Sequence, residues 1–184
     1  MQNNIVKNKS LDFAVRVVNM YQFLNQEKKE FVLSKQDQLT TFLSYHTFSE
    51  LILFPWGHTY NPIADQNAYN VHRTMAETMS EWNNYRPQQS SDLYIASGDT
   101  TDWSYGELGL ISFTFELDPK NMWNGGFYPG QDTIDIVFEK NIKPALYLIE
   151  QADNPYKVLN KSTYGVSFIN TDVGAKHAQL SESL

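Results

Sequence analysis

The 184-residue sequence contains no cysteine, which excludes disulfide bonds and thiolate metal ligands but fits either a reducing or an oxidising compartment. No run of 18 or more apolar residues is present, so the sequence predicts no membrane-spanning helix and no membrane partner. The first residues, MQNNIVKNKSLDF, lack the apolar core of a secretory signal. These absences together predict a cytoplasmic protein.

Basic side chains are also scarce, with 14 Lys and Arg against 21 Asp and Glu and a formal charge of −7. Without a basic field, nucleic acid is not an expected partner. The charge is uneven, because residues 1–36 carry a net of +3 and the remainder a net of −10. A change of sign at this point indicates two segments of different origin, which divides the chain into 1–36, 37–160 and a polar tail, 161–184.

Residues 10–34 predict an amphipathic helix whose apolar face needs a partner. Its apolar positions recur at three- and four-residue spacing: Leu11, Ala14, Val15, Val18, Tyr21 and Leu24. The segment NIVKNKSLDFAVRVVNMYQFLNQEKKEFVLSKQ resembles the first helix of the small four-helix-bundle proteins encoded in intervening sequences of bacterial 23S ribosomal RNA genes. That resemblance covers no catalytic motif, so it implies an interaction role for this segment.

Downstream of residue 36, the spacing of apolar residues is typical of strands in some segments and of helices in others. Residues 40–46 and 112–117 predict strands, and in the second of these Phe113 and Phe115 lie opposite Thr114 and Glu116. Two helices are predicted, each with one apolar face. The faces consist of Ala68, His72, Met75, Met79 and Trp82 in the first helix, and of Ile134, Phe138, Ile142, Ala145 and Ile149 in the second. An α/β domain is therefore expected.

Two stretches carry a more specific resemblance: TFLSYHTFSELILFPWG at 41–57 and LYIASGDTTDWSYGELGLISFTFEL at 93–117. Both resemble the C-terminal half of zinc metallocarboxypeptidases of the A and T type. The resemblance implies a partial metallocarboxypeptidase-like mixed sheet with flanking helices, preceded by the N-terminal amphipathic helix. It also implies zinc as cofactor, the C-terminus of a peptide as substrate, and hydrolysis of its C-terminal residues. Full-length members of this family are often secreted.

The same resemblance implies roles for five residues. His46 occupies the position of a zinc ligand at the end of a strand, and Glu116 that of the general base, which takes a proton from zinc-bound water and passes it to the leaving amine. Tyr94 matches the mobile tyrosine that caps bound substrate, and Thr101 lines the base of the pocket for the terminal side chain. Phe48 lines the substrate cleft. The family also implies cis peptide bonds at Thr47–Phe48, Pro55–Trp56 and Asp118–Pro119.

The family's other ligands come from an upstream His-x-x-Glu motif, and residues 1–45 contain no histidine. Upstream arginines that clamp the substrate carboxylate have no counterpart either. Because a catalytic zinc normally has three protein ligands, the sequence predicts a truncated, metallocarboxypeptidase-like protein that is inactive alone. Self-association is expected through the N-terminal helix or an exposed sheet edge. The alternatives are a four-helix-bundle-type interaction protein and a non-functional chimera of two genes.

Overall fold

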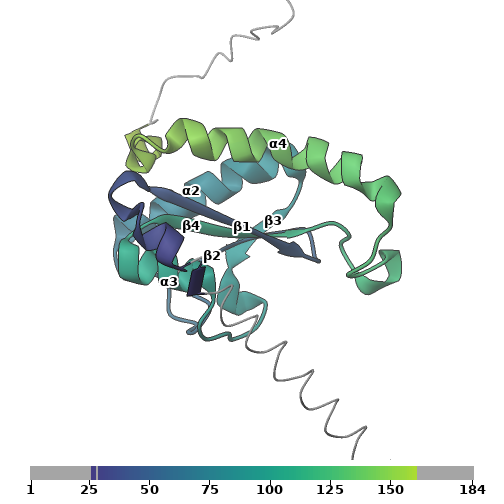
Figure 1. The fold of residues 1–184 in the computed structure, drawn as a ribbon, viewed down its shortest axis with the longest axis horizontal. Coiled ribbons are helices and arrows are strands. Elements are labelled where there is room, and N and C mark those ends of the chain that lie inside the picture. Colours follow the sequence, from purple (N-terminus) through teal and green to yellow (C-terminus); the bar gives the residue numbers. More distant parts are fainter. Residues whose placement is uncertain (1–25, 28, 161–184) are drawn as a thin grey trace, which may run out of the picture.

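The computed structural model describes residues 26–27 and 29–160, which are built around a four-stranded mixed sheet (Figure 1). The strands are β1 (Thr41–Thr47), β2 (Leu51–Phe54), β3 (Arg86–Gln89) and β4 (Ile111–Leu117), and their order in the sheet is β1-β4-β2-β3. β1 runs parallel to β4, β2 runs antiparallel to β4, and β3 runs parallel to β2. The two central strands are therefore β4 and β2, and both are almost entirely buried.

Three longer helices surround this sheet: α2 (Gln66–Asn83), α3 (Thr100–Leu108) and α4 (Ile134–Gln151). Aspartates begin the first two, since Asp65 and Asp99 each accept hydrogen bonds from two backbone N–H groups of the first turn. Left-handed residues end them, Asn84 at φ 59° and Gly109 at φ 68°. Short 3₁₀ helices complete the architecture: η1 (Gln36–Gln38), η2 (Ser90–Asp92), η3 (Met122–Asn124), η4 (Gln131–Thr133) and η5 (Pro155–Asn160).

The helices form layers on the two faces of the sheet, with α4 above it and α3 below it in Figure 1. Phe113 and Phe115 of β4 point into one core cluster with residues of α2 and with Tyr147 and Leu148 of α4. On the other face, the Thr114 hydroxyl contacts that of Thr101 in α3. The fold is thus a mixed α/β sheet with flanking helices, and the predicted alternation of β4 is confirmed.

The predicted second apolar face, Ile134, Phe138, Ile142, Ala145 and Ile149, does lie along one side of α4, but it does not meet the core. Its four large side chains are between 41% and 71% exposed. The buried residues of α4 are instead Asn141, Pro144, Tyr147, Leu148 and Gln151. Hydrophobic periodicity identified the helix correctly, whereas the packing of α4 against α2 and the sheet selected a different face.

The predicted helix at 10–34 and the tail at 161–184 fall mostly outside the described residues. Residues 29–33 are helical, and the N–H of Ser34 still donates to the carbonyl oxygen of Glu30 at 2.9 Å. This agrees with the predicted C-terminal end of that helix. Within the described part of the chain, no helix is both long and apolar enough to cross a membrane.

Candidate functional site

His46 and Glu116 lie side by side because the parallel pairing of β1 with β4 places them in register. The Nδ1 atom of His46 is 3.9 Å from Oε1 of Glu116. The histidine side chain is 54% exposed and the glutamate side chain 10% exposed. Burial raises the pKa of the Glu116 carboxyl, and the nearby His46 offsets part of that increase. The pair therefore combines a solvent-facing imidazole with a partly desolvated carboxylate.

Thr101 lies on the same face of the sheet as Glu116 and is fully buried. Its Oγ1 is 2.5 Å from Oγ1 of Thr114, the residue two positions before Glu116 on β4. Asp99 fixes the backbone here by accepting hydrogen bonds from the N–H groups of Thr101 and Asp102 at 2.7 and 2.8 Å. The structure thus places an uncharged, buried hydroxyl pair on the face of the sheet that carries Glu116, and the role of Thr101 in a side-chain pocket stays a prediction.

The other two predicted substrate contacts lie on loops. Phe48 follows β1 directly, is half-buried, and packs edge-on against Phe127 with ring centroids 4.9 Å apart. Tyr94 follows η2 and is 63% exposed. Thr47–Phe48, Pro55–Trp56 and Asp118–Pro119 are all cis, as predicted.

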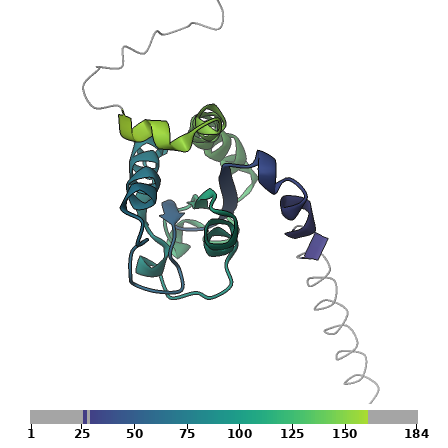
Figure 2. The same cartoon turned by 90° about the vertical axis from the view of Figure 1, so that its left-hand side faces the viewer.

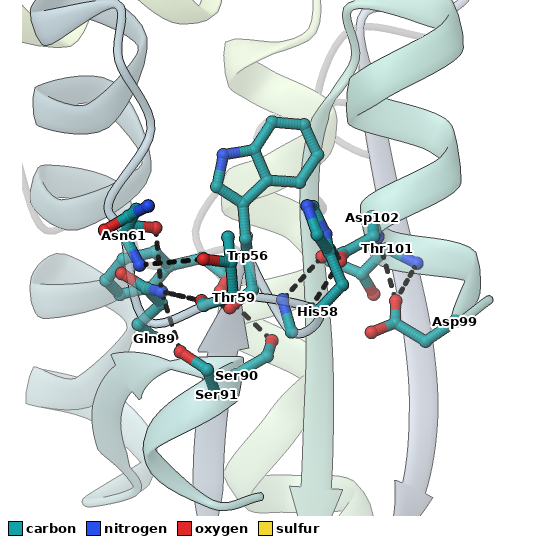
Figure 3. Close-up of polar contacts among 12 residues, drawn as sticks. Trp56, His58, Thr59, Asn61, Gln89, Ser90, Ser91, Asp99, Thr101 and Asp102 are labelled. Carbon is teal, nitrogen blue, oxygen red and sulfur yellow. Dashed lines mark hydrogen bonds and ion pairs between the residues drawn. The ribbon is translucent and has the colours of Figure 1, made fainter. Parts of the chain in front are cut away.

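The loop after β2 is held by two polar side chains that the sequence did not single out (Figure 3). The Asp102 carboxylate accepts hydrogen bonds from the N–H groups of Gly57 and His58 at 2.8 and 3.0 Å, and it also accepts one from Nδ1 of His58 at 2.6 Å. From the opposite side, Nε2 of Gln89 donates to the carbonyl oxygens of Trp56, Thr59 and Asn61. The one signal in the sequence for a role of Asp102 was its position directly after Thr101 in the motif. Its partners are 44 and 45 residues away, so only the fold shows them.

The described residues do not complete a catalytic zinc site. Such a site normally takes three protein ligands, and within residues 26–27 and 29–160 no group of three or more His, Cys, Asp or Glu is arranged to hold a metal ion. His46 offers one imidazole, and the carboxylate beside it is Glu116. Any further ligands would have to come from outside the described residues.

Curated relatives are found among zinc carboxypeptidases. A zinc carboxypeptidase of Saccharothrix mutabilis subsp. capreolus is 34% identical over 134 residues, which cover 71% of this chain and 31% of the relative. One from Simulium vittatum is 32% identical over 125 residues, covering 59% of this chain and 40% of the relative. The chain therefore spans about a third of the length of the curated relatives it matches.

Solved structures agree on the fold. Bovine thrombin-activatable fibrinolysis inhibitor, in complex with tick carboxypeptidase inhibitor, superposes with a TM-score of 0.57 at 23% sequence identity. The superposition covers 69% of this chain and 45% of that chain.

A family model described as zinc carboxypeptidase matches residues 6–143. The match begins inside the segment predicted to resemble a four-helix-bundle protein, so it does not favour that alternative. The boundary predicted at residue 36 stays a prediction, because most of the first segment lies outside the described residues. The matched range covers most of the sequence, and the chain belongs to the zinc carboxypeptidase family.

Proposed function

We propose that this chain carries part of the active site of a peptidase that removes C-terminal residues from peptides, with Glu116 as the general base and His46 as a zinc ligand. The observation that carries the proposal is the pairing of these two side chains across β1 and β4, 3.9 Å apart. A general base works best when its pKa lies near the working pH, and burial moves the pKa of Glu116 in that direction. The surrounding motif belongs to a family of zinc carboxypeptidases.

Thr101, Tyr94 and Phe48 are proposed to contact the peptide. Thr101 supplies an uncharged pocket base through its hydroxyl pair with Thr114, so the pocket has no fixed requirement for a charged C-terminal side chain. Tyr94 is exposed on a loop, and its proposed role is to close over a bound peptide. Phe48 follows the strand that ends beside His46, which places it at the margin of the same site.

We also propose that the chain is inactive alone. Zinc in this family supplies the activated water that attacks the peptide carbonyl, and the described residues lack a three-ligand set for it. Because the chain spans about a third of its curated relatives, the remaining ligands are expected from further polypeptide.

The test is zinc affinity, measured by competition with a chromophoric chelator on the parent chain and on His46→Ala, together with hydrolysis of a blocked peptide. The proposal predicts weak zinc binding that His46→Ala weakens further, and no hydrolysis above that of Glu116→Gln. Tight binding of one zinc per chain with hydrolysis that Glu116→Gln abolishes would show that the site is complete. Zinc binding that is unchanged in His46→Ala would remove His46 as a ligand.

A further inference from the structure

The side chain of Lys140 joins two carboxylates that come from different parts of the chain. Its Nζ contacts Oδ1 of Asp118, which directly follows β4, and lies 3.8 Å from Oε1 of Glu50, in the turn between β1 and β2. All three side chains are partly buried, with exposed fractions between 14% and 33%. One cation therefore compensates two acidic groups at a place where solvent screens their charges incompletely.

The position of α4 makes this contact possible. Figure 1 shows the first turns of α4 at the end of the sheet where β1 and β4 finish. In Figure 2 the helix is seen nearly end-on, above the sheet. Lys140 lies in the second turn of α4. Its two contacts are made within the described residues, so they do not depend on what covers the outer face of the helix.

The backbone of Glu50 indicates that its side chain has a role. Its φ is 54°, a left-handed conformation that is costly for a residue other than glycine. The same residue fixes the start of β3, because the N–H of Arg86 donates to its carbonyl oxygen at 2.9 Å. Next to it, the N–H of Ser49 donates to the carbonyl oxygen of Leu117 at 3.1 Å. A glycine would suit this backbone better, so a carboxylate here points to a contact that offsets the cost.

The charged and titratable groups that face Glu50 come from the end of β4, the loop after it, and α4. They are Asp118, Lys120 and Lys140. Burial raises the pKa of the Glu50 carboxyl, Asp118 raises it further, and the two lysines offset part of the increase. Burial also acts to raise the pKa of Asp118, but hydrogen bonds from Lys140 and from the Tyr85 hydroxyl lower it overall. Without Lys140, the ionised forms of the two carboxyl groups would repel each other.

We propose that Lys140 is a positioning residue, which holds the turn between β1 and β2 against the end of β4 by compensating Glu50 and Asp118. This turn carries Phe48, whose ring packs against that of Phe127 with centroids 4.9 Å apart. The consequence for a bound peptide rests on the proposed role of Phe48 as a substrate contact. The position of the turn does not, so it is tested without catalysis, and failure of the peptidase proposal would leave it standing.

Amide hydrogen exchange of the full chain, followed by NMR at pH 7 and pH 5, tests the proposal by comparing the parent with Lys140→Met. Protection of the Ser49 and Arg86 N–H groups, corrected for the intrinsic effect of pH on exchange, should fall about 10-fold at pH 7, because two ionised carboxylates lose a charge-assisted contact. At pH 5 the loss should be less than about 3-fold, because Glu50 then takes up a proton and no longer repels its neighbour.

Three further variants separate positioning by charge from a simple loss of packing. Lys143→Met removes a cation from the same helix, where it lies 4.8 Å from the ring centroid of Trp82, and it should leave both amides unchanged. Lys140→Arg keeps the charge and should retain the protection of the parent. Glu50→Gln added to Lys140→Met should restore protection at pH 7, because an amide is uncharged and is able to donate a hydrogen bond to Asp118.

The N–H of Ala96, which donates to the carbonyl oxygen of Gly57 at 3.0 Å, reports on a loop beyond the other end of β2. It should keep its protection in every variant. Unchanged protection of the turn in Lys140→Met, an equal loss at Ala96, an equal loss at both pH values, or no rescue by Glu50→Gln overturns the proposal. If Lys140→Met does not fold, Lys140→Gln replaces it and must show the same dependence on pH.

Discussion

Acidification is expected to destabilise this fold through one buried side chain, His72 of α2. The residue is completely buried, and its ring lies against those of Tyr105 and Phe113. Nε2 accepts a hydrogen bond from the backbone N–H of Ser112 at 3.0 Å, so the proton resides on Nδ1, which donates to the carbonyl oxygen of Ala68 at 2.8 Å. A second proton on Nε2 would face the Ser112 N–H. Burial lowers the pKa of His72 to about 4.

The magnitude follows from the difference between the folded and unfolded states. The unfolded chain has a histidine pKa near 6.5, and each pKa unit of difference is worth about 1.4 kcal/mol, so the gap down to about 4 corresponds to about 3 kcal/mol. Between pH 6.5 and pH 4 the unfolded state binds this proton and the folded state does not. The free energy of unfolding therefore falls as the pH falls through that window, and His72 adds no further loss below it. For a chain of this size, the loss corresponds to a Tm lower by roughly 6–12 °C.

Urea unfolding at several pH values between 7 and 4.5 measures this effect when His72→Gln is compared with the parent. Glutamine is polar but does not titrate, while every other histidine and carboxyl titrates in both proteins. The variant is expected to be less stable at pH 7, because the Ser112 N–H is left with poorer hydrogen bonding. Between pH 7 and pH 4.5, its stability should then fall by about 2.4 kcal/mol less than that of the parent, because the range stops short of the folded-state pKa of about 4. Parallel pH curves for the two proteins would refute the reasoning.

Three further changes test other parts of the structure. Tyr85→Phe removes the buried hydroxyl that accepts a hydrogen bond from Asn141 at 2.9 Å. Urea unfolding should show a free energy of unfolding about 1–2 kcal/mol lower than that of the parent, and an unchanged value would contradict the prediction. Asp102→Asn weakens the acceptor for the N–H groups of residues 57–58, so limited proteolysis should cut this loop faster than in the parent. Glu116→Gln should raise Tm at pH 7, because burial raises the pKa of that carboxyl and the ionised form is unfavourable in the fold. That gain should vanish at acidic pH, where the glutamic acid is already protonated, and a gain that persists would contradict the assignment.

The predicted strands and the two helices predicted downstream of residue 36 were confirmed, because their hydrophobic periodicity was strong. β2 was not predicted, because all four of its residues are buried and a short buried run has no alternation. β3 was not predicted either, because RPQQ is polar and contains a proline. α3 has nine residues and little amphipathic pattern, and it is defined by the caps at Asp99 and Gly109. These elements depend on their neighbours and on local caps more than on periodicity.

The sequence by itself determined the family and the local elements that place His46 and Glu116 at the ends of two strands. Only the tertiary structure decided that β1 and β4 pair in the register that brings these residues together, although 69 positions of sequence separate them. It also decided that α4 turns Tyr147 and Leu148 inward and leaves Ile142 outside. The physical reason is the sequence distance over which each feature is determined. Hydrophobic periodicity, helix caps and turns depend on residues that are close in the sequence. By contrast, segments that meet only in the folded chain determine the strand register, the buried face of a helix and the side chains around His46.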